Sequence, residues 1–123
     1  MSTHMIKKFF NDKDVLSSGS EVGYIITRDY NKMNGYIRQI SFYMNSGVAT
    51  ELSNIEIRYF SGDSTLTNLV YKYINGTISS GRFVDSGINA PFNLNPVDNE
   101  DGLILYVQAN ANATFDIRVD LEL

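Results

Sequence analysis

The C-terminal stretch Phe115-Asp-Ile-Arg-Val-Asp-Leu-Glu-Leu123 alternates apolar and charged residues without a break. Successive side chains of an extended chain point to opposite sides, so all the apolar residues of this stretch share one face. The charged residues share the other face: Asp116, Arg118, Asp120 and Glu122. This pattern predicts a β-strand with one face in a hydrophobic core and the other in solvent.

Two earlier segments extend this reading. Residues 54–60 alternate in the same way, with Ile55, Ile57 and Tyr59 on one face. Residues 103–109 are apolar on both faces, because Ile104 and Tyr106 lie opposite the set Leu103, Leu105 and Val107. A strand that is apolar on both faces is expected at the centre of a sheet, or under a partner that covers its outer face.

Further strands are predicted over residues 22–27, 36–44, 69–74, 77–84 and 88–94. The pairs Asn34-Gly35 and Asn75-Gly76 predict tight hairpins, because a type I′ turn needs positive φ at two positions. Turns or bulges are also predicted at Ser46-Gly47, Ser61-Gly62-Asp63, Ser80-Gly81 and Ser86-Gly87. Pro91 cannot donate to a strand ladder, which predicts that residues 88–94 form an edge strand.

About eight short strands in 123 residues predict an all-β fold, an antiparallel β-sandwich. A jelly roll is the preferred form, and an immunoglobulin-like sandwich is the alternative, although the core tryptophan common in that fold is absent. Residues 21–123 are expected to form the sandwich domain. Residues 6–20 are interpreted as an N-terminal arm or first strand followed by a linker, and residues 1–5 as a candidate cloning remnant.

Composition argues against several classes of function. The chain has a net charge of −4, which disfavours a nucleic-acid partner. It has no cysteine and one histidine, His4, so neither a thiol nucleophile nor a Ser-His-acid triad is expected. No glycine-rich phosphate loop is present, and no cofactor is predicted. We therefore expect a protein that is not an enzyme, with no signal peptide and no membrane partner.

Two kinds of ligand site remain as hypotheses. Asp98, Glu100 and Asp101 place carboxylates in one loop, where Ca²⁺ is conceivable, but the spacing departs from an EF-hand loop and favours an ordinary acidic turn. Tyr71 and Tyr73 fall on one face of a predicted strand, where they could stack on a glycan. The alternative is that both rings pack against the core or a cross-strand neighbour.

Protein contact is the third hypothesis. Ile104 and Tyr106 lie opposite the core set of their strand, and Phe60 lies off the face shared by Ile55, Ile57 and Tyr59. Phe9 and Phe10 are adjacent aromatic residues in the N-terminal segment. Aromatic and aliphatic anchors dominate the energy of protein interfaces, so these residues are candidates for an oligomer interface. The alternative is that the protein's own loops cover them.

The C-terminal third resembles the closing hairpin of small phage virion proteins. The resemblance rests on Gly102-Leu-Ile-Leu-Tyr-Val-Gln-Ala-Asn110, a small-residue turn, and the alternating strand from Phe115 to Leu123. It implies a sandwich on a virus particle, made in the host cytoplasm: a capsid decoration, head-fibre or tail accessory protein, commonly a homotrimer that contacts other virion proteins. The alternative function is a carbohydrate-binding module or receptor-binding tip domain.

Overall fold

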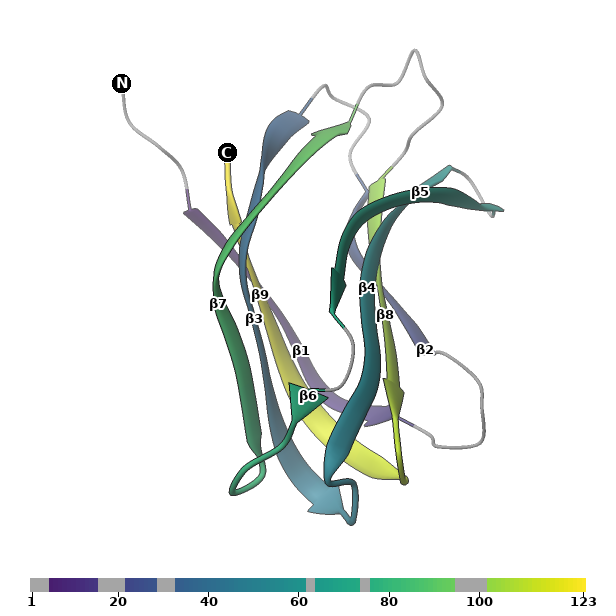
Figure 1. Cartoon of the computed structure of the whole chain (residues 1–123). Helices are drawn as coiled ribbons and strands as arrows, with labels where there is room; N and C mark the ends of the chain where they lie inside the picture. Colours follow the sequence, from purple (N-terminus) through teal and green to yellow (C-terminus); the bar gives the residue numbers. More distant parts are fainter. Residues whose placement is uncertain (1–4, 16–21, 29–32, 62–63, 74–75, 95–101) are drawn as a thin grey trace.

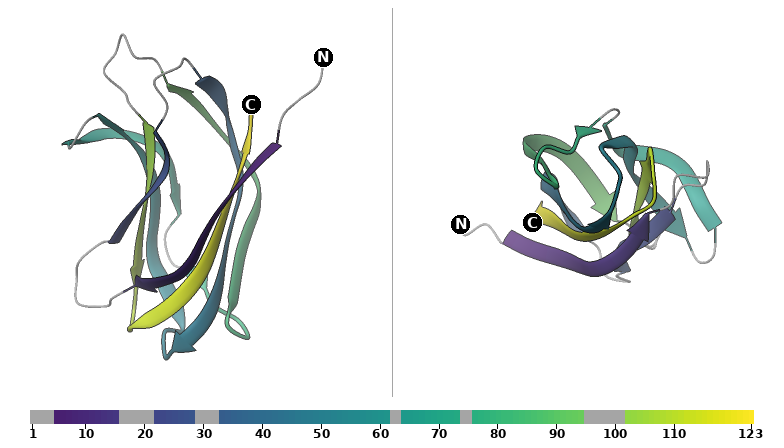
Figure 2. Two further views of the ribbon diagram at one scale, coloured as in Figure 1. Left: turned by 180° about the vertical axis from the view of Figure 1, so that it is seen from behind. Right: turned by 90° about the horizontal axis from the view of Figure 1, so that it is seen from below.

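The computed structural model describes residues 5–15, 22–28, 33–61, 64–73, 76–94 and 102–123. These residues form β-strands that build two antiparallel sheets, packed face to face (Figure 1 and Figure 2). The strands are β1 (Met5–Val15), β2 (Val22–Arg28), β3 (Met33–Gly47), β4 (Glu51–Ser61), β5 (Ser64–Tyr73), β6 (Gly76–Thr77), β7 (Arg82–Leu94), β8 (Gly102–Ala109) and β9 (Ala113–Glu122). The described part of the chain holds no helix that could span a bilayer.

Strand pairing follows a nested pattern. Sheet A has the order β1-β9-β3-β7, and sheet B has the order β2-β8-β4-β5, with the short β6 beside β4. The hairpin β4–β5 is innermost in sequence, and the pairs β3–β7, β2–β8 and β1–β9 enclose it in turn. This is the wrapped connectivity of a jelly roll. An immunoglobulin-like sandwich would place its first two strands side by side, whereas β1 and β2 lie in different sheets.

The core lies between the sheets and is built by the predicted alternation. Phe115, Ile117, Val119 and Leu121 of β9 are all buried, as are Ile55 and Ile57 of β4. The ring of Phe42 in β3 lies at its centre, with its centroid 5.9 Å from that of Phe115 and 6.1 Å from that of Phe83. The period-two pattern therefore identified which face of these strands lines the core. The prediction that the charged face lies in solvent is wrong at Asp120, which is buried on the other face of β9, as Glu56 is on β4.

Two positional predictions are confirmed. The strand that is apolar on both faces, β8, lies between β2 and β4 in sheet B. The strand that contains Pro91, β7, lies at the edge of sheet A. β8 has apolar side chains on both faces, which suits a central strand. β7 contains Pro91, which has no backbone donor, and this suits an edge strand.

The C-terminal segment is not the hairpin that its resemblance implied. Its two strands lie in different sheets, β8 in sheet B and β9 in sheet A. The connection at residues 110–112 therefore crosses from one sheet to the other. Both strands carry a complete apolar face, and the two faces are buried by facing each other across the core.

The hairpin predicted at Asn34-Gly35 is also wrong, because both residues lie inside β3, where Gly35 pairs with Phe92. A Cβ atom on Gly35 would stand 2.3 Å from the carbonyl oxygen of Glu122 in β9. The glycine is therefore needed for the close approach of two strands and not for a turn. Asn75, in the second predicted hairpin, lies outside the described residues.

The strand predicted over residues 77–84 is interrupted. β6 ends at Thr77 and β7 begins at Arg82, and the Ser80-Gly81 turn between them has positive φ at both residues, 55° and 75°. The turn predicted at Ser80-Gly81 is thus confirmed. At Ser86-Gly87 the register with β3 shifts and Gly87 has φ 73°, which is the predicted bulge.

The N-terminal segment belongs to the sandwich, because it forms strand β1. It pairs with β9 along residues 5–15, so this segment forms a first strand. Phe10 turns inward, with its ring centroid 5.8 Å from that of Tyr24 in sheet B. The Tyr24 hydroxyl donates to the carbonyl oxygen of Asp14 at 2.6 Å, and burial together with the Asp14 charge raises the pKa of Tyr24 to about 12. These contacts hold the two sheets together along one side.

The opposite side is joined by β5 and β7, and it allows a test. The Tyr71 hydroxyl donates to the carboxylate of Asp85, and burial and this hydrogen bond raise the pKa of Tyr71. We expect Tyr71→Phe to lower the free energy of unfolding by about 1.5–2 kcal/mol, the lower part of the range for a charged partner, because the pair is half-buried. Urea denaturation would measure this change. Tyr43→Phe, at an exposed tyrosine, is the control, and equal stability of both variants would contradict the assignment.

Candidate functional site

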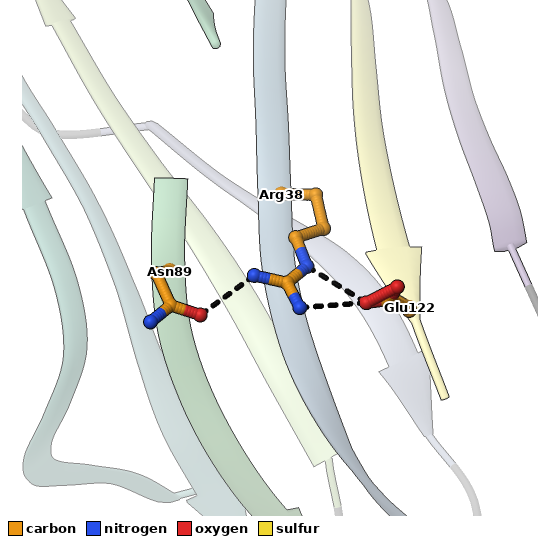
Figure 3. A network of polar contacts seen from close by, with 3 residues as sticks. All are labelled: Arg38, Asn89 and Glu122. Atoms are coloured by element: carbon orange, nitrogen blue, oxygen red, sulfur yellow. Dashed lines mark hydrogen bonds and ion pairs between the residues drawn. The ribbon is translucent and has the colours of Figure 1, made fainter. Parts of the chain in front are cut away.

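The outer face of sheet A is organised at one end by a polar network that spans three strands (Figure 3). Arg38 of β3 donates through Nε and Nη2 to Oε2 of Glu122 in β9, at 2.9 and 2.6 Å. Its Nη1 donates to Oδ1 of Asn89 in β7 at 2.6 Å, and the guanidinium lies 4.5 Å from the ring centroid of Tyr36. Each of the three guanidinium nitrogens of Arg38 therefore donates a hydrogen bond within the protein.

An open groove of about 520 Å³ lies beside this network on the same face. β1, β9, β3 and β7 all contribute to it, because Phe9, Arg118, Ser41 and Val84 stand opposite one another in the strand register. Because the Ser41 side chain is small, it does not fill the space between its larger neighbours, and the groove forms there. The remaining lining residues are Asn11, Gln39, Phe42, Tyr43, Arg82, Asp116 and Ile117.

Exposed apolar side chains border this groove. Phe9 is 57% exposed, Tyr43 49% and Val84 48%. Phe9 lies on β1, while Tyr43 and Val84 lie on β3 and β7, so the two aromatic rings come from strands separated by β9. Each ring therefore has a surface that a ligand can reach.

The two arginines that line the groove, Arg118 and Arg82, differ in their ion pairing. Arg118 donates from Nε and Nη2 to both carboxylate oxygens of Asp120 at 2.7 and 2.6 Å, and this interaction raises the pKa of Arg118. Arg82 lies 5.9 Å from the ring centroid of Tyr43, and it forms no ion pair with any residue that the structure describes. Arg82 is thus available to an anionic group.

The β1 border of the groove is held by Asp116. Its Oδ1 accepts a hydrogen bond from the backbone N–H of Asp12 at 2.9 Å and from Nδ2 of Asn45 at 2.8 Å. Asp12 has φ 52°, at the bulge where the register of β1 against β9 shifts. Bulges of this kind redirect side chains near functional sites, and Asp12 lies three residues after Phe9.

The outer face of sheet B carries three apolar side chains on one register line, with Arg58 between two of them. Ile25 of β2 pairs with Ile104 of β8, and Arg58 of β4 pairs with both Ile104 and Leu69 of β5. Ile25 is 45% exposed and Leu69 is 47% exposed. We call Ile25, Leu69 and Ile104 the sheet B apolar row, since they follow one register line across the sheet.

A buried carboxylate lies beside this row. Glu56 is 3% exposed and forms ion pairs with Arg58 and, at 3.0 Å, with Lys72. Burial by itself would raise the pKa of Glu56, but the hydrogen bond from Lys72 and the two positive charges lower it below 4.5. The Arg58 guanidinium also lies 5.3 Å from the ring centroid of Tyr106. The cluster of Glu56, Arg58 and Lys72 therefore carries one net positive charge.

The five residues proposed for an interface fall into three positions. Ile104 and Tyr106 lie half-buried on the outer face of sheet B. Phe60 of β4 pairs in register with Gly102 of β8, and its side chain is not among those that the structure describes. Phe9 faces outward from sheet A. Phe10 packs inward against Tyr24. The structure thus brings the first two together and separates Phe9 from them.

The other proposed site residues are placed as follows. Tyr71 and Tyr73 pack against the core between the sheets, and the ring centroid of Tyr73 is 5.4 Å from that of Phe83. Asp98, Glu100 and Asp101 lie outside the described residues. Within the ranges that are described, no three acidic, histidine or cysteine side chains gather closely enough to hold a metal ion.

Sequence reasoning missed the groove. Tyr43 follows the buried Phe42 in a predicted strand, so alternation alone placed it on the outer face. That signal was present. The neighbours of Tyr43 on the adjacent strands could not be predicted from the sequence, because the register of the strands places Arg82 and Asp116 beside it.

Comparisons with known proteins complete the description. No protein-family model and no curated protein matches this chain. Among solved structures it is similar to FlhE, with TM-score 0.44, 7% identity and coverage of 99% of this chain and 97% of that one. It is also similar to a structure of infectious bursal disease virus, Gx strain, with TM-score 0.42, 10% identity and coverage of 99% of this chain and 32% of the viral chain.

A second similar structure is that of the infectious bursal disease virus VP2 subviral particle. Here the TM-score is 0.36 and the identity 13%, over 97% of this chain and 32% of that chain. This chain therefore spans about a third of the length of either viral chain. At these identities and TM-scores the comparisons assign no function.

Proposed function

We propose that this chain is a non-enzymatic structural protein of a virus particle, a capsid decoration or fibre-type accessory protein that assembles through protein–protein contacts. The observation that carries the proposal is the sheet B apolar row. Two of its aliphatic side chains, Ile25 and Leu69, are nearly half exposed on the outer face of a complete sheet. Jelly rolls are a common architecture of capsid proteins, which is compatible with this role.

The partner that we propose for this face is a second copy of the chain. The adjoining cluster of Glu56, Arg58 and Lys72 has one net positive charge, whereas the whole chain has a net charge of −4. The face is therefore attracted to the acidic remainder of another copy rather than to itself. Such a contact between unlike surfaces is heterologous, and a heterologous contact whose rotation closes forms a ring such as the trimer that we propose.

The energy of this contact is modest. Covering the exposed halves of Ile25 and Leu69 contributes about 2–3 kcal/mol before the cost of association is subtracted. A contact of this size becomes stable when several are made together. A particle that presents many copies meets this condition, since linked contacts raise the effective concentration.

Light scattering over a concentration series tests the proposal. We expect a mass near three times 13.8 kDa at high concentration. Leu69→Asp should shift the species towards the monomer by about tenfold or more in dissociation constant, because a charge would be buried in the contact. Val84→Asp, an equally exposed position on sheet A, is the matched control. A wild-type mass that stays at 13.8 kDa throughout would contradict self-assembly.

A further inference from the structure

The groove on sheet A lies on the sheet opposite the apolar row, so substitutions in that row do not touch its lining. Its lining combines exposed aromatic rings with hydroxyl, amide and charged groups. Its volume of about 520 Å³ is in the range typical of small-ligand sites. A surface of this kind calls for a ligand that has both apolar faces and many hydrogen-bonding groups.

The aromatic rings are placed to hold such a ligand at two points. Phe9 lies on β1 and Tyr43 on β3, two strands apart, which corresponds to roughly 10 Å across the sheet. Both rings are about half exposed, so their faces can be covered by a ligand without displacing the core. The C–H faces of sugar rings are apolar and flat enough to stack on aromatic side chains in this way.

The lining of the groove also includes polar side chains. Ser41 and Gln39 both contribute to it, and Arg118 is held in one orientation by its paired hydrogen bonds to Asp120. Sugar hydroxyls lose free energy if they are buried without partners, so a saccharide requires fixed donors and acceptors beside the stacking surface. An apolar protein side chain inserted here would leave these same groups without partners, which disfavours an apolar peptide segment as the occupant.

Arg82 adds a selective element. It borders the groove beside Tyr43, and no described residue neutralises its guanidinium. Arginine presents paired donors that match the two oxygens of a carboxylate. We propose that this groove binds a short oligosaccharide that carries a carboxylate, with Phe9 and Tyr43 stacking on its rings and Arg82 pairing with its acidic group.

The first experiment is an array of acidic and neutral glycans probed with the intact chain. We expect binding to glycans that contain a carboxylated sugar. Calorimetry with sialyllactose and with lactose then compares an acidic probe with its neutral counterpart. If neither the array nor calorimetry with these probes detects binding, the proposal is overturned.

Variants assign the groups. Phe9→Ala and Tyr43→Ala should each weaken binding of the best acidic glycan by about tenfold, because each removes one stacking surface. Arg82→Gln should remove the preference for the acidic over the neutral glycan while stacking persists. Tyr36→Ala, an exposed tyrosine on the same sheet outside the groove, should leave the affinity unchanged. Thermal melting verifies that each variant is folded.

Two further outcomes would contradict the proposal. Equal binding of acidic and neutral glycans would show that Arg82 does not pair with the carboxylate. Loss of binding with Tyr36→Ala, but not with Tyr43→Ala, would place the ligand elsewhere. The assembly proposal is judged separately, because it is read from the mass of sheet B variants, which leave this groove intact.

Discussion

Phe115→Ala is expected to lower the free energy of unfolding by about 3–5 kcal/mol, a large part of the total stability of a domain of this size. Phe115 is fully buried in β9, and its ring meets that of Phe42 edge to face at 5.9 Å. β9 pairs with both β1 and β3, so the cavity would open at the centre of sheet A. Guanidinium denaturation followed by tyrosine fluorescence would measure the change.

Phe9→Ala is the matched control for this substitution. It removes the same side chain from an outward position of the same sheet, where 57% of the residue is already in solvent. The expected cost is about 0.5–1 kcal/mol, because little apolar area returns to water. Comparable losses in the two variants would show that the assigned faces of the sheet are wrong.

Glu56→Gln is the second substitution with a large expected effect, about 2–3 kcal/mol of lost stability at neutral pH. Glu56 is 3% exposed, and its removal as a charge leaves Arg58 and Lys72 side by side without their common partner. Removing one member of a buried ion pair is strongly destabilising. The cost is reduced here because the Arg58 and Lys72 side chains are 30% and 43% exposed, so water screens part of their repulsion.

The pH dependence of this difference checks its cause. Because the pKa of Glu56 is lower in the folded protein than its usual value of 4.5, the ionised carboxylate stabilises the fold above that value. This stabilisation is lost as the pH falls through the folded-state pKa. The gap in stability between the wild type and Glu56→Gln should therefore be constant near neutral pH and narrow as the pH falls below 4.5.

Glu51→Gln serves as the control for this series. Glu51 lies on the same strand, and its carboxylate forms no ion pair within the described part of the chain. Its variant should follow the wild type at every pH. A gap for Glu56→Gln that stays constant with pH would mean that packing, and not charge, accounts for the loss.

Alternation of apolar and polar residues was enough to predict the core-facing side of β4, β8 and β9. Ile57 and Phe115 were identified as core residues from the alternation alone, because a strand has two faces and its apolar face is the one that is buried. Pro91 indicated an edge strand because its backbone lacks a donor. These are local properties, which neighbouring residues in the chain carry by themselves.

Pairing between distant strands could not be obtained in the same way. The Asn34-Gly35 pair has the composition of a turn, yet Gly35 lies in a long strand against the backbone of Glu122. β8 and β9 follow each other like the arms of a hairpin but belong to different sheets. In both cases the local signal was overridden by the burial of two apolar faces against each other, which involves residues far apart in sequence.

The candidate sites divide along the same line. The sequence by itself determined the class of fold, the side chains of the core and the outward direction of residues such as Ile104 and Tyr106. Only the tertiary structure decided which of these outward residues are neighbours: Phe9 and Tyr43 on one sheet, Ile25 and Leu69 on the other, and Glu56 between two cations. The physical reason is that the direction of a side chain follows from the local period of its strand, whereas its neighbours follow from register, and register is set by the packing of the whole sandwich.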